Sequence, residues 1–492
     1  MPPVLVPLLL LMATATLFYI LSMRRRTNRL NPPPGPPKDP FIGHLRIMPK
    51  TQSGLAFHSW AKIYGDVMQL EVLGQRIVIL DTHQAATDLL DKRSSIYSDR
   101  PAFPLYDILG ASNTSQSPEV YRVYSNSNGG SATTCPDLLG SAPENYIKLM
   151  SRFSTSIVVR IATGHQVVSQ DDPYLHLSKM VYEAFSRTGR PGGSALDLFP
   201  VLRYFPSWFP GAYYAGVARA WKPTVRKLYD YPFDCVQMER ETGTAVPSFL
   251  LSRLEELDSG TSIIDEEEIK GVVATFFSAG EATTWSVVTL FVLAMVLHPE
   301  CQKRAQEELD AVVGAARLPH FGDRGSLPYI ECILQETLRW HPATPLGIPH
   351  RSTQDDFYRG MHIAKGTLVF PNIQAMSLDE RVYKDATSFR PERFLPPPLG
   401  PAEPPFNCGF GFGRRVCVGL HLADNSLWIA IATILATCTI SHALDSDGNE
   451  IIPKVEMSDG LASHPNDFAC EITARRPAVE GLLEEATQGV EF

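Results

Sequence analysis

The sequence predicts a mainly α-helical protein with a minor β part, organised as a single large domain behind an N-terminal transmembrane helix. Apolar residues recur at helical spacing over several long segments, and apolar and polar residues alternate on both sides of Gly74-Gln75. We find no internal repeat and no linker after residue 40 that divides the chain. The predicted helices span residues 143–162, 215–241, 266–297, 299–313 and 327–340, and the predicted strands span residues 67–73 and 76–80.

The composition excludes several classes of function. With 44% hydrophobic and 20% charged residues, the 492-residue chain is close to the average for globular proteins. Its net charge of -9 is modest, and no basic run is longer than Arg24-Arg25-Arg26, which argues against nucleic acid as a partner. The 8 cysteines are scattered without a C-x-x-C pair, so neither a zinc site nor a disulfide framework is indicated. A reducing compartment fits this pattern best.

Residues 1–23 are predicted to form a transmembrane anchor. The segment from Val4 to Ser22 has no charged residue and is about as long as a bilayer core requires. The alternative is a cleaved signal peptide, but such peptides carry their positive charge before the apolar stretch, and here the arginines follow it. The positive-inside rule then places the catalytic domain, residues 40–492, in the cytosol behind a basic, proline-rich linker of residues 24–39. The endoplasmic reticulum membrane is the predicted location.

A glycine-rich stretch with a cysteine near its end is the strongest chemical motif. It runs from Phe406 to Gly419 and precedes an apolar, helix-like run over residues 420–438. Glycines let a tight turn approach a bulky planar ligand, and backbone N–H groups at a helix start favour the thiolate form of a cysteine. An anionic sulfur at Cys417 is therefore a candidate iron ligand. The pattern F-x-x-G-x-R-x-C-x-G is filled by Phe410, Gly413, Arg415, Cys417 and Gly419.

This stretch resembles the heme-binding loop of the cytochromes P450, in which the cysteine is the proximal iron ligand. The resemblance covers residues 1–110 and 143–480 and implies the cytochrome P450 fold, with heme b as the cofactor. It also implies that Arg415 pairs with a heme propionate and that Phe410 shields the sulfur. A thiolate ligand favours O–O cleavage at the iron. The other interpretations of Cys417 are a redox thiol and a metal pair with His421 at i,i+4 spacing.

Two further motifs support this resemblance. Glu336 and Arg339 lie three residues apart on one face of a predicted helix, a spacing that by itself is usually a solvated surface pair. The resemblance implies that they form a buried charge network with Arg393 near the heme loop, as structural support without a chemical role. It also implies that His350 and Arg100 contact heme propionates, although a lone histidine is more often a hydrogen-bonded polar residue of the core.

Thr283 and Glu281 are the predicted catalytic residues. They lie in a long apolar helical pattern, which otherwise indicates a core helix. The resemblance implies that Thr283 hydrogen-bonds the bound oxygen and helps to deliver protons, and that the small Ala279-Gly280 pair leaves room for dioxygen. The family usually has an acid directly before this threonine. Here that residue is Ala282, and Glu281 is rotated by about 100° around the helix, so it would have to act through water.

Residues 111–142 depart from the resemblance. A helix carrying W-x-x-x-R, which holds a heme propionate, is expected there, but the segment is rich in serine and asparagine and contains none of the 6 tryptophans. Such a composition favours a loop or disorder. One explanation is a local reading-frame or splice error in a predicted gene product, and the other is genuine divergence with heme held more loosely. Sequencing the transcript distinguishes them.

The leading hypothesis is a heme-thiolate monooxygenase that inserts one oxygen atom of O2 into an apolar small molecule. Electrons come from NADPH through NADPH–cytochrome P450 reductase, which docks on basic residues near the heme loop such as Arg414. The alternative is a catalytically impaired or non-oxygenase relative: a heme isomerase or dehydratase, or a heme-deficient product of a mispredicted gene. Ala282 and the missing propionate helix favour that alternative. The sequence does not specify the substrate, because pocket-lining residues come largely from variable loops.

Overall fold

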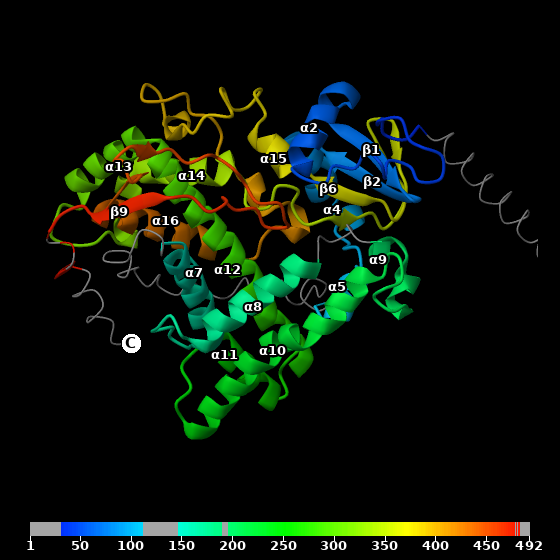
Figure 1. Ribbon diagram of the computed structural model, residues 1–492, viewed down its shortest axis with the longest axis horizontal. Coiled ribbons are helices and arrows are strands. Elements are labelled where there is room, and N and C mark those ends of the chain that lie inside the picture. Colours follow the sequence, from blue (N-terminus) through cyan, green and yellow to red (C-terminus); the bar gives the residue numbers. More distant parts are fainter. Residues whose placement is uncertain (1–30, 112–145, 189–194, 478, 480, 483–492) are drawn as a thin grey trace, which may run out of the picture. The chain divides into compact units, whose positions relative to one another are not determined.

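The computed structural model describes residues 31–111, 146–188, 195–477, 479 and 481–482 (Figure 1). The predicted anchor of residues 1–23, the first part of the linker and nearly all of the anomalous segment 111–142 lie outside these residues, so these interpretations stay predictions. The described residues form two compact units. One unit contains the chain up to Pro101 together with Pro349–Asn372, and the other contains Ala102–Ile348 and the chain from Ile373 onward. The interpretation of residues 40–492 as one domain stays a prediction.

The first unit is built around a mixed sheet (Figure 1). Strands β1 and β2 form the predicted antiparallel hairpin, but its two-residue turn is Leu73-Gly74, one residue earlier than expected. Both turn residues have positive φ, 49° and 89°, which suits glycine at the second position. Strand β6 adds to β2 in parallel, so the sheet order is β1-β2-β6-β3. The elements are α2 (Ser53–Tyr64), β1 (Val67–Val72), β2 (Gln75–Leu80), α3 (His83–Ala86), η1 (Thr87–Asp91), α4 (Ser94–Tyr97), β3 (His350–Arg351), β4 (Asp356–Tyr358), β5 (Met361–Ile363) and β6 (Leu368–Pro371).

The second unit is mainly helical, as the sequence predicts. Its sheet is small, with the strand order β8-β7-β9. The helices are α5 (Pro104–Leu109), α7 (Tyr146–Thr163), α8 (Pro173–Thr188), α9 (Ala195–Leu198), α10 (Tyr213–Thr242), α11 (Phe249–Asp258), α12 (Glu266–Leu297), α13 (Pro299–Val312), α14 (Pro328–Trp340), α15 (Ile373–Ser377) and α16 (Leu420–Thr437). Short 3-10 turns are η5 (Pro200–Tyr204), η6 (Phe321–Ser326), η7 (Pro391–Phe394), η8 (Cys408–Phe410) and η9 (Gly413–Arg415), and the strands are β7 (Cys438–Leu444), β8 (Glu450–Ile451) and β9 (Cys470–Ala474).

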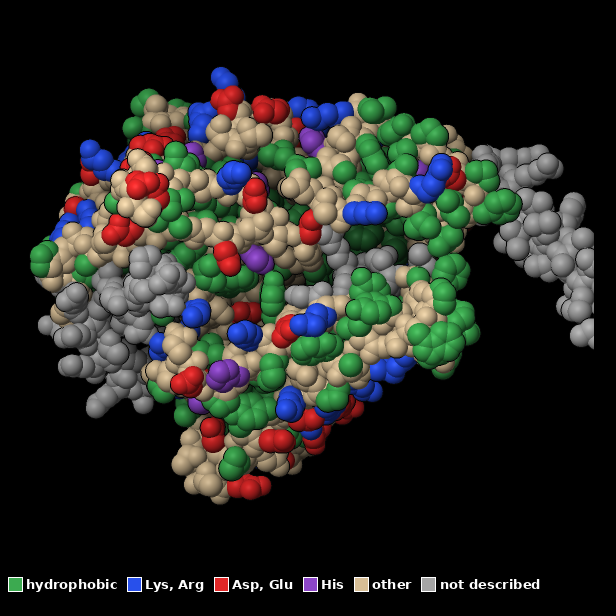
Figure 2. Space-filling model, viewed as in Figure 1, with side chains coloured by type: hydrophobic (Ala, Val, Ile, Leu, Met, Phe, Trp, Pro, Cys, Tyr) green, Lys and Arg blue, Asp and Glu red, His purple; other side chains and the backbone are tan. Residues whose placement is uncertain are grey.

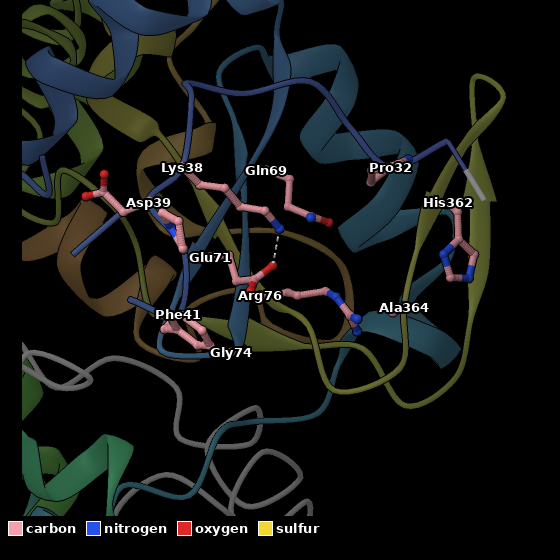
Figure 3. A pocket seen from close by; sticks show the side chains of 11 residues that line it. Pro32, Lys38, Asp39, Phe41, Gln69, Glu71, Gly74, Arg76, His362 and Ala364 are labelled. Carbon is pink, nitrogen blue, oxygen red and sulfur yellow. Dashed lines mark hydrogen bonds and ion pairs between the residues drawn. The ribbon is translucent and has the colours of Figure 1, made fainter. Parts of the chain in front are cut away.

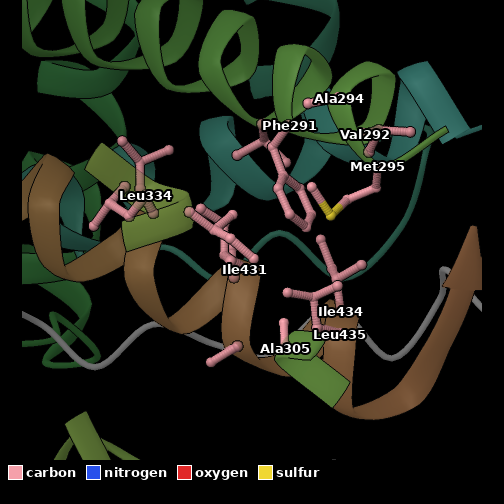
Figure 4. Packing of buried hydrophobic residues seen from close by; sticks show 14 of the residues in the cluster. Phe291, Val292, Ala294, Met295, Ala305, Leu334, Ile431, Ile434 and Leu435 are labelled. Carbon is pink, nitrogen blue, oxygen red and sulfur yellow. The ribbon is translucent and has the colours of Figure 1, made fainter. Parts of the chain in front are cut away.

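Helix α12 is the central element of the second unit. It begins at a capping box, in which the Asp265 carboxylate accepts from the Glu268 amide and the Glu268 carboxylate accepts from the Asp265 amide. Its C-terminal half is apolar on all sides, which is typical of a helix buried on every face. Figure 4 shows Phe291 and Met295 of this helix packed among side chains of α16 such as Ile434. Packing of the C-terminal half in this core fixes the position of α12, and thereby the position of the residues near its middle.

Helices α12 and α16 are also long and apolar enough to cross a membrane by length and composition. Most of the apolar stretch of each is buried within the second unit, where both contribute to the same hydrophobic cluster. Their hydrophobicity is therefore explained by the protein core.

Candidate functional site

The glycine-rich stretch folds into a tight loop that ends at the start of α16. Gly411 and Gly413 adopt positive φ values of 84° and 56°, a conformation that L side chains rarely tolerate. The loop is closed by the Cys417 amide, which donates to the Phe410 carbonyl at 2.7 Å. The Cys417 carbonyl accepts from the amide of Leu420, the first residue of α16, at 3.3 Å. Two of the loop's glycines are thus required by its backbone, and the loop places the cysteine three residues before the helix.

Cys417 is exposed, and the protein around it still desolvates its thiol. Burial by the surrounding protein nevertheless raises the pKa of the thiol, while the Gly419 amide lowers it. The amide effect that the sequence predicts is present but smaller than desolvation, so a metal ion must displace the proton when it binds the sulfur.

The other residues of the loop motif have different surroundings. Phe410 and Arg415 are partly buried, and Phe412 is buried. A Cβ atom added at Gly419 would lie 3.8 Å from the Cys417 sulfur, which is ordinary van der Waals contact. Space alone therefore does not require glycine at position 419. No described contact tests the predicted roles of Phe410 and Arg415 toward heme, which stay predictions.

The donor set around Cys417 fits an iron porphyrin better than a metal ion held by protein alone. Among the described residues, no group of three or more His, Cys, Asp or Glu side chains is placed to hold a metal ion. The alternative pair of Cys417 and His421 therefore gains no third described ligand of these types. A porphyrin supplies four nitrogen ligands itself and needs only an axial one from the protein. Cys417 would hold this group.

Helix α12 carries the two predicted catalytic residues on different faces. The Thr283 hydroxyl donates to the Ala279 carbonyl at 2.8 Å, one turn earlier, so its oxygen lone pairs stay available to accept a hydrogen bond. Gly280 faces α7, because a Cβ atom at this position would lie 2.8 Å from a methyl group of Val158. The close approach of two helices thus accounts for this glycine. It does not test the predicted room for dioxygen.

The Glu281 carboxyl lies in the packing between α12, α7 and α8. Its Oε1 accepts from the Ser151 hydroxyl of α7 at 3.3 Å, and Ser178 of α8 also bonds to it. The side chain is buried, and this burial raises the pKa of the carboxyl to about 7, although the serines oppose the shift. The structure brings Glu281 together with two serines that sequence reasoning missed, and no described contact joins it to Thr283.

The predicted charge network is present and completely buried. The Glu336 carboxylate accepts from Arg339 Nε and Nη2 at 2.7 and 2.8 Å and from Arg393 Nε at 3.1 Å. Side chains of all three residues are 0% exposed. Arg393 also bonds to Glu403 at 2.7 Å, and Arg339 donates to the Ser377 carbonyl. Each buried charge therefore has partners, and the network ties α14 to η7 and to the segment that precedes it.

The two propionate candidates from the first unit lie in adjacent segments. Arg100 Nη1 donates to the Pro349 carbonyl at 2.9 Å, and His350 Nδ1 bonds to the Tyr97 carbonyl at 2.7 Å. His350 is buried, so the structure supplies it with a partner of the ordinary kind. Arg100 and His350 are 250 positions apart in the chain, and the backbone pairing of Asp99 with Arg351 brings them together. Their predicted contact with heme stays a prediction.

A pocket in the first unit contains none of the predicted site residues (Figure 3). Its volume is about 380 Å³, and it is lined by the proline-rich segment, the β1–β2 hairpin and β5. Lys38 and Glu71 form an ion pair of 2.8 Å at its wall. No residue predicted to bind heme or to act in catalysis lines it.

Comparison with known proteins identifies the family. Residues 140–469 match the family model of cytochrome P450. A cytochrome P450 monooxygenase of Armillaria gallica is 36% identical, with 96% of this chain and 97% of the relative aligned. Relatives with the same description from Postia placenta and Coprinopsis cinerea are each 35% identical, with 97% of this chain and 97% and 95% of the relatives aligned. Because the family model spans more than half of the chain and these relatives align along nearly all of it, the chain belongs to the cytochrome P450 family and is a heme monooxygenase.

Proposed function

We propose that the protein binds heme b through Cys417 and inserts one oxygen atom of O2 into an apolar small molecule. Electrons come from NADPH through a flavoprotein reductase. The observation that carries this proposal is the tight glycine-rich loop before α16, which holds Cys417, the one exposed cysteine among the described residues. Heme supplies the activation of oxygen, and the protein supplies binding, orientation and protons. The relatives' descriptions as monooxygenases support the same reaction class.

The residues of α12 would manage protons in this reaction. The Thr283 hydroxyl keeps acceptor capacity because its proton is donated within the helix. Glu281 holds a proton near neutral pH but faces two serines on the other side of α12. A proton could therefore pass between Glu281 and Thr283 only through a chain of water molecules around the helix.

The position of Glu281 away from Thr283 favours a second function, that of a heme isomerase or dehydratase. If Glu281 stays with Ser151 and Ser178, α12 lacks an acid directed at Thr283, since the residue before the threonine is Ala282. A heme isomerase or dehydratase, which needs no external electrons, would tolerate that arrangement. Consumption of NADPH in the presence of added reductase separates the two functions, because only the monooxygenase draws electrons.

We also propose that the protein is held at the endoplasmic reticulum membrane with its catalytic part in the cytosol. The apolar N-terminal segment and the arginines after it support this location. Exposed hydrophobic side chains of the second unit support it independently, because tryptophan and tyrosine favour the bilayer interface. Tyr204 and Trp208 are 81% and 80% exposed. The exposed side chains of this segment are those of Phe199, Val201, Tyr204, Trp208 and Tyr213. Figure 2 shows hydrophobic side chains on the surface of the molecule in green.

The heme proposal is tested by the carbon monoxide difference spectrum of the reduced protein. Cys417→Ala should abolish the band of a thiolate-ligated heme. Cys408→Ala is the matched control, because Cys408 lies in the same loop but is buried, and a buried cysteine acts mainly as a small apolar side chain. Cys408→Ala should keep the band. A Cys417→Ala protein with an unaltered heme spectrum would reject the proposal.

A further inference from the structure

Three aromatic side chains of the second unit meet beside α12. They are Tyr182 of α8, Trp285 of α12 and His464 of the segment before β9. The rings of Trp285 and His464 have centroids 4.5 Å apart, and those of Tyr182 and Trp285 are 6.4 Å apart. Trp285 lies one helical turn after Glu281 on the same face of α12, and it is about 3 Å beyond Thr283 along the helix axis but about 200° around it. Tyr182 is 44% exposed, so the Tyr182–His464–Trp285 cluster leads from the helix of the candidate site to the surface.

The hydrogen bonds of His464 define which atom carries its proton. Nδ1 lies 2.8 Å from the Pro465 carbonyl, which can only accept, so Nδ1 is the donor. In the neutral ring, Nε2 then has a free lone pair and accepts from the Tyr182 hydroxyl at 3.1 Å. Tyr182 therefore has a base in place for its phenolic proton.

Trp285, unlike Tyr182, has no described base beside its proton. Its indole Nε1 is buried and has no hydrogen-bond partner among the residues that the structure describes. The indole N–H is a donor only, so no described group is placed to take its proton. If Trp285 loses an electron, it keeps its proton, whereas Tyr182 can lose an electron and a proton together.

We propose that the Tyr182–His464–Trp285 cluster is an electron relay that carries oxidising equivalents from the heme site to the protein surface when no substrate consumes them. With heme bound and peroxide as the oxidant, Trp285 would supply one of the two electrons that reduce the peroxide, and it would become a radical cation. Tyr182 then returns one electron to Trp285 and passes its hydroxyl proton to Nε2 of His464. A water-soluble reductant such as ascorbate restores Tyr182 with one electron, and His464 gives back the proton. The relay rests on the proposed function, because its oxidant arises at the heme.

The test uses the heme-loaded protein without substrate, mixed with hydrogen peroxide and frozen for electron paramagnetic resonance. The wild type should show a tyrosyl radical, and Tyr182→Phe should lose most of this signal, with only a hydroxyl removed from an exposed side chain. Tyr213→Phe is the matched control, because Tyr213 is also exposed but its described ring contact is Tyr214. His464→Gln should also lower the radical yield, because glutamine can accept the hydrogen bond but cannot take the proton.

The outcomes separate the relay from the proposed function. Each sample is first checked for the carbon monoxide band, and a wild type without that band rejects the proposed heme site. If the band is present, equal radical yields in Tyr182→Phe and Tyr213→Phe overturn the relay, as does the absence of any tyrosyl radical in the wild type. A second readout is the rate at which peroxide bleaches the heme, which should rise in Tyr182→Phe and Trp285→Phe.

Discussion

Replacing Glu281 with glutamine should remove a pH-dependent loss of stability. Glutamine has the shape of glutamic acid and can still bond to the hydroxyls of Ser151 and Ser178, but it has no charge to bury. In the folded protein the pKa of Glu281 is raised from 4.5 to about 7, mainly by burial. The substitution therefore isolates the cost of ionising one carboxyl between three helices.

The magnitude follows from the pKa shift. One pKa unit corresponds to about 1.4 kcal/mol, so ionised Glu281 costs the folded state about 3 kcal/mol. Because the folded pKa lies above the unfolded one, the unfolded protein binds fewer protons between these two values. The free energy of unfolding therefore falls as the pH rises from 4.5 to about 7 and receives no further change from this group above that range.

Urea unfolding of the wild type and Glu281→Gln in the same detergent measures the effect. Between about pH 5 and about pH 8, the difference in unfolding free energy between the two proteins should shift by about 2 to 3 kcal/mol in favour of the variant. Glu307→Gln, which changes an exposed glutamate of α13, is the control and should show no such shift. A constant difference between wild type and Glu281→Gln over this range would refute the reasoning.

Three other substitutions test the packing and charge of the second unit. Gly280→Ala should destabilise by about 1 to 3 kcal/mol, because its Cβ would lie 2.8 Å from a methyl group of Val158, and thermal unfolding of the double variant with Val158→Ala should recover most of the loss. Glu336→Ala should lower the free energy of unfolding by about 3 to 5 kcal/mol, because it leaves two buried guanidinium groups without their shared carboxylate. Unfolding in urea measures this loss, and a loss below about 1 kcal/mol would contradict the network. Asp265→Ala should cost about 1 kcal/mol by removing the cap of α12, while Asp265→Asn, which keeps an acceptor, should cost less in the same assay.

Much of the local structure was predictable because its signals lie close together in the chain. The helix predicted over residues 266–297 matches α12, and the helices predicted over residues 215–241 and 327–340 match α10 and α14 within two residues. The β1–β2 hairpin was predicted for the same reason, since its strands are joined by a two-residue turn. Apolar periodicity and turn residues are sufficient for such elements.

Elements that depend on distant partners were not predictable in this way. Strand β6 has only four residues and pairs with β2 from almost 300 positions away. Short strands of this kind have no strong periodicity of their own, because the pairing stabilises them. Helix α8 was also missed, although its buried positions include Leu177 and Val181 at helical spacing.

The candidate site likewise has features that neighbouring residues determine and features that distant residues determine. Cys417, its glycines and the start of α16 lie within a few residues of one another, so the sequence alone determined that one cysteine would precede a helix in a tight, glycine-rich loop. Only the tertiary structure decided which groups surround Glu281, that Glu403 joins Arg393, and that Tyr182 meets His464 beside Trp285. The physical reason is that a loop or a helix is selected by neighbouring residues, whereas burial and its electrostatic consequences depend on which distant helices pack together.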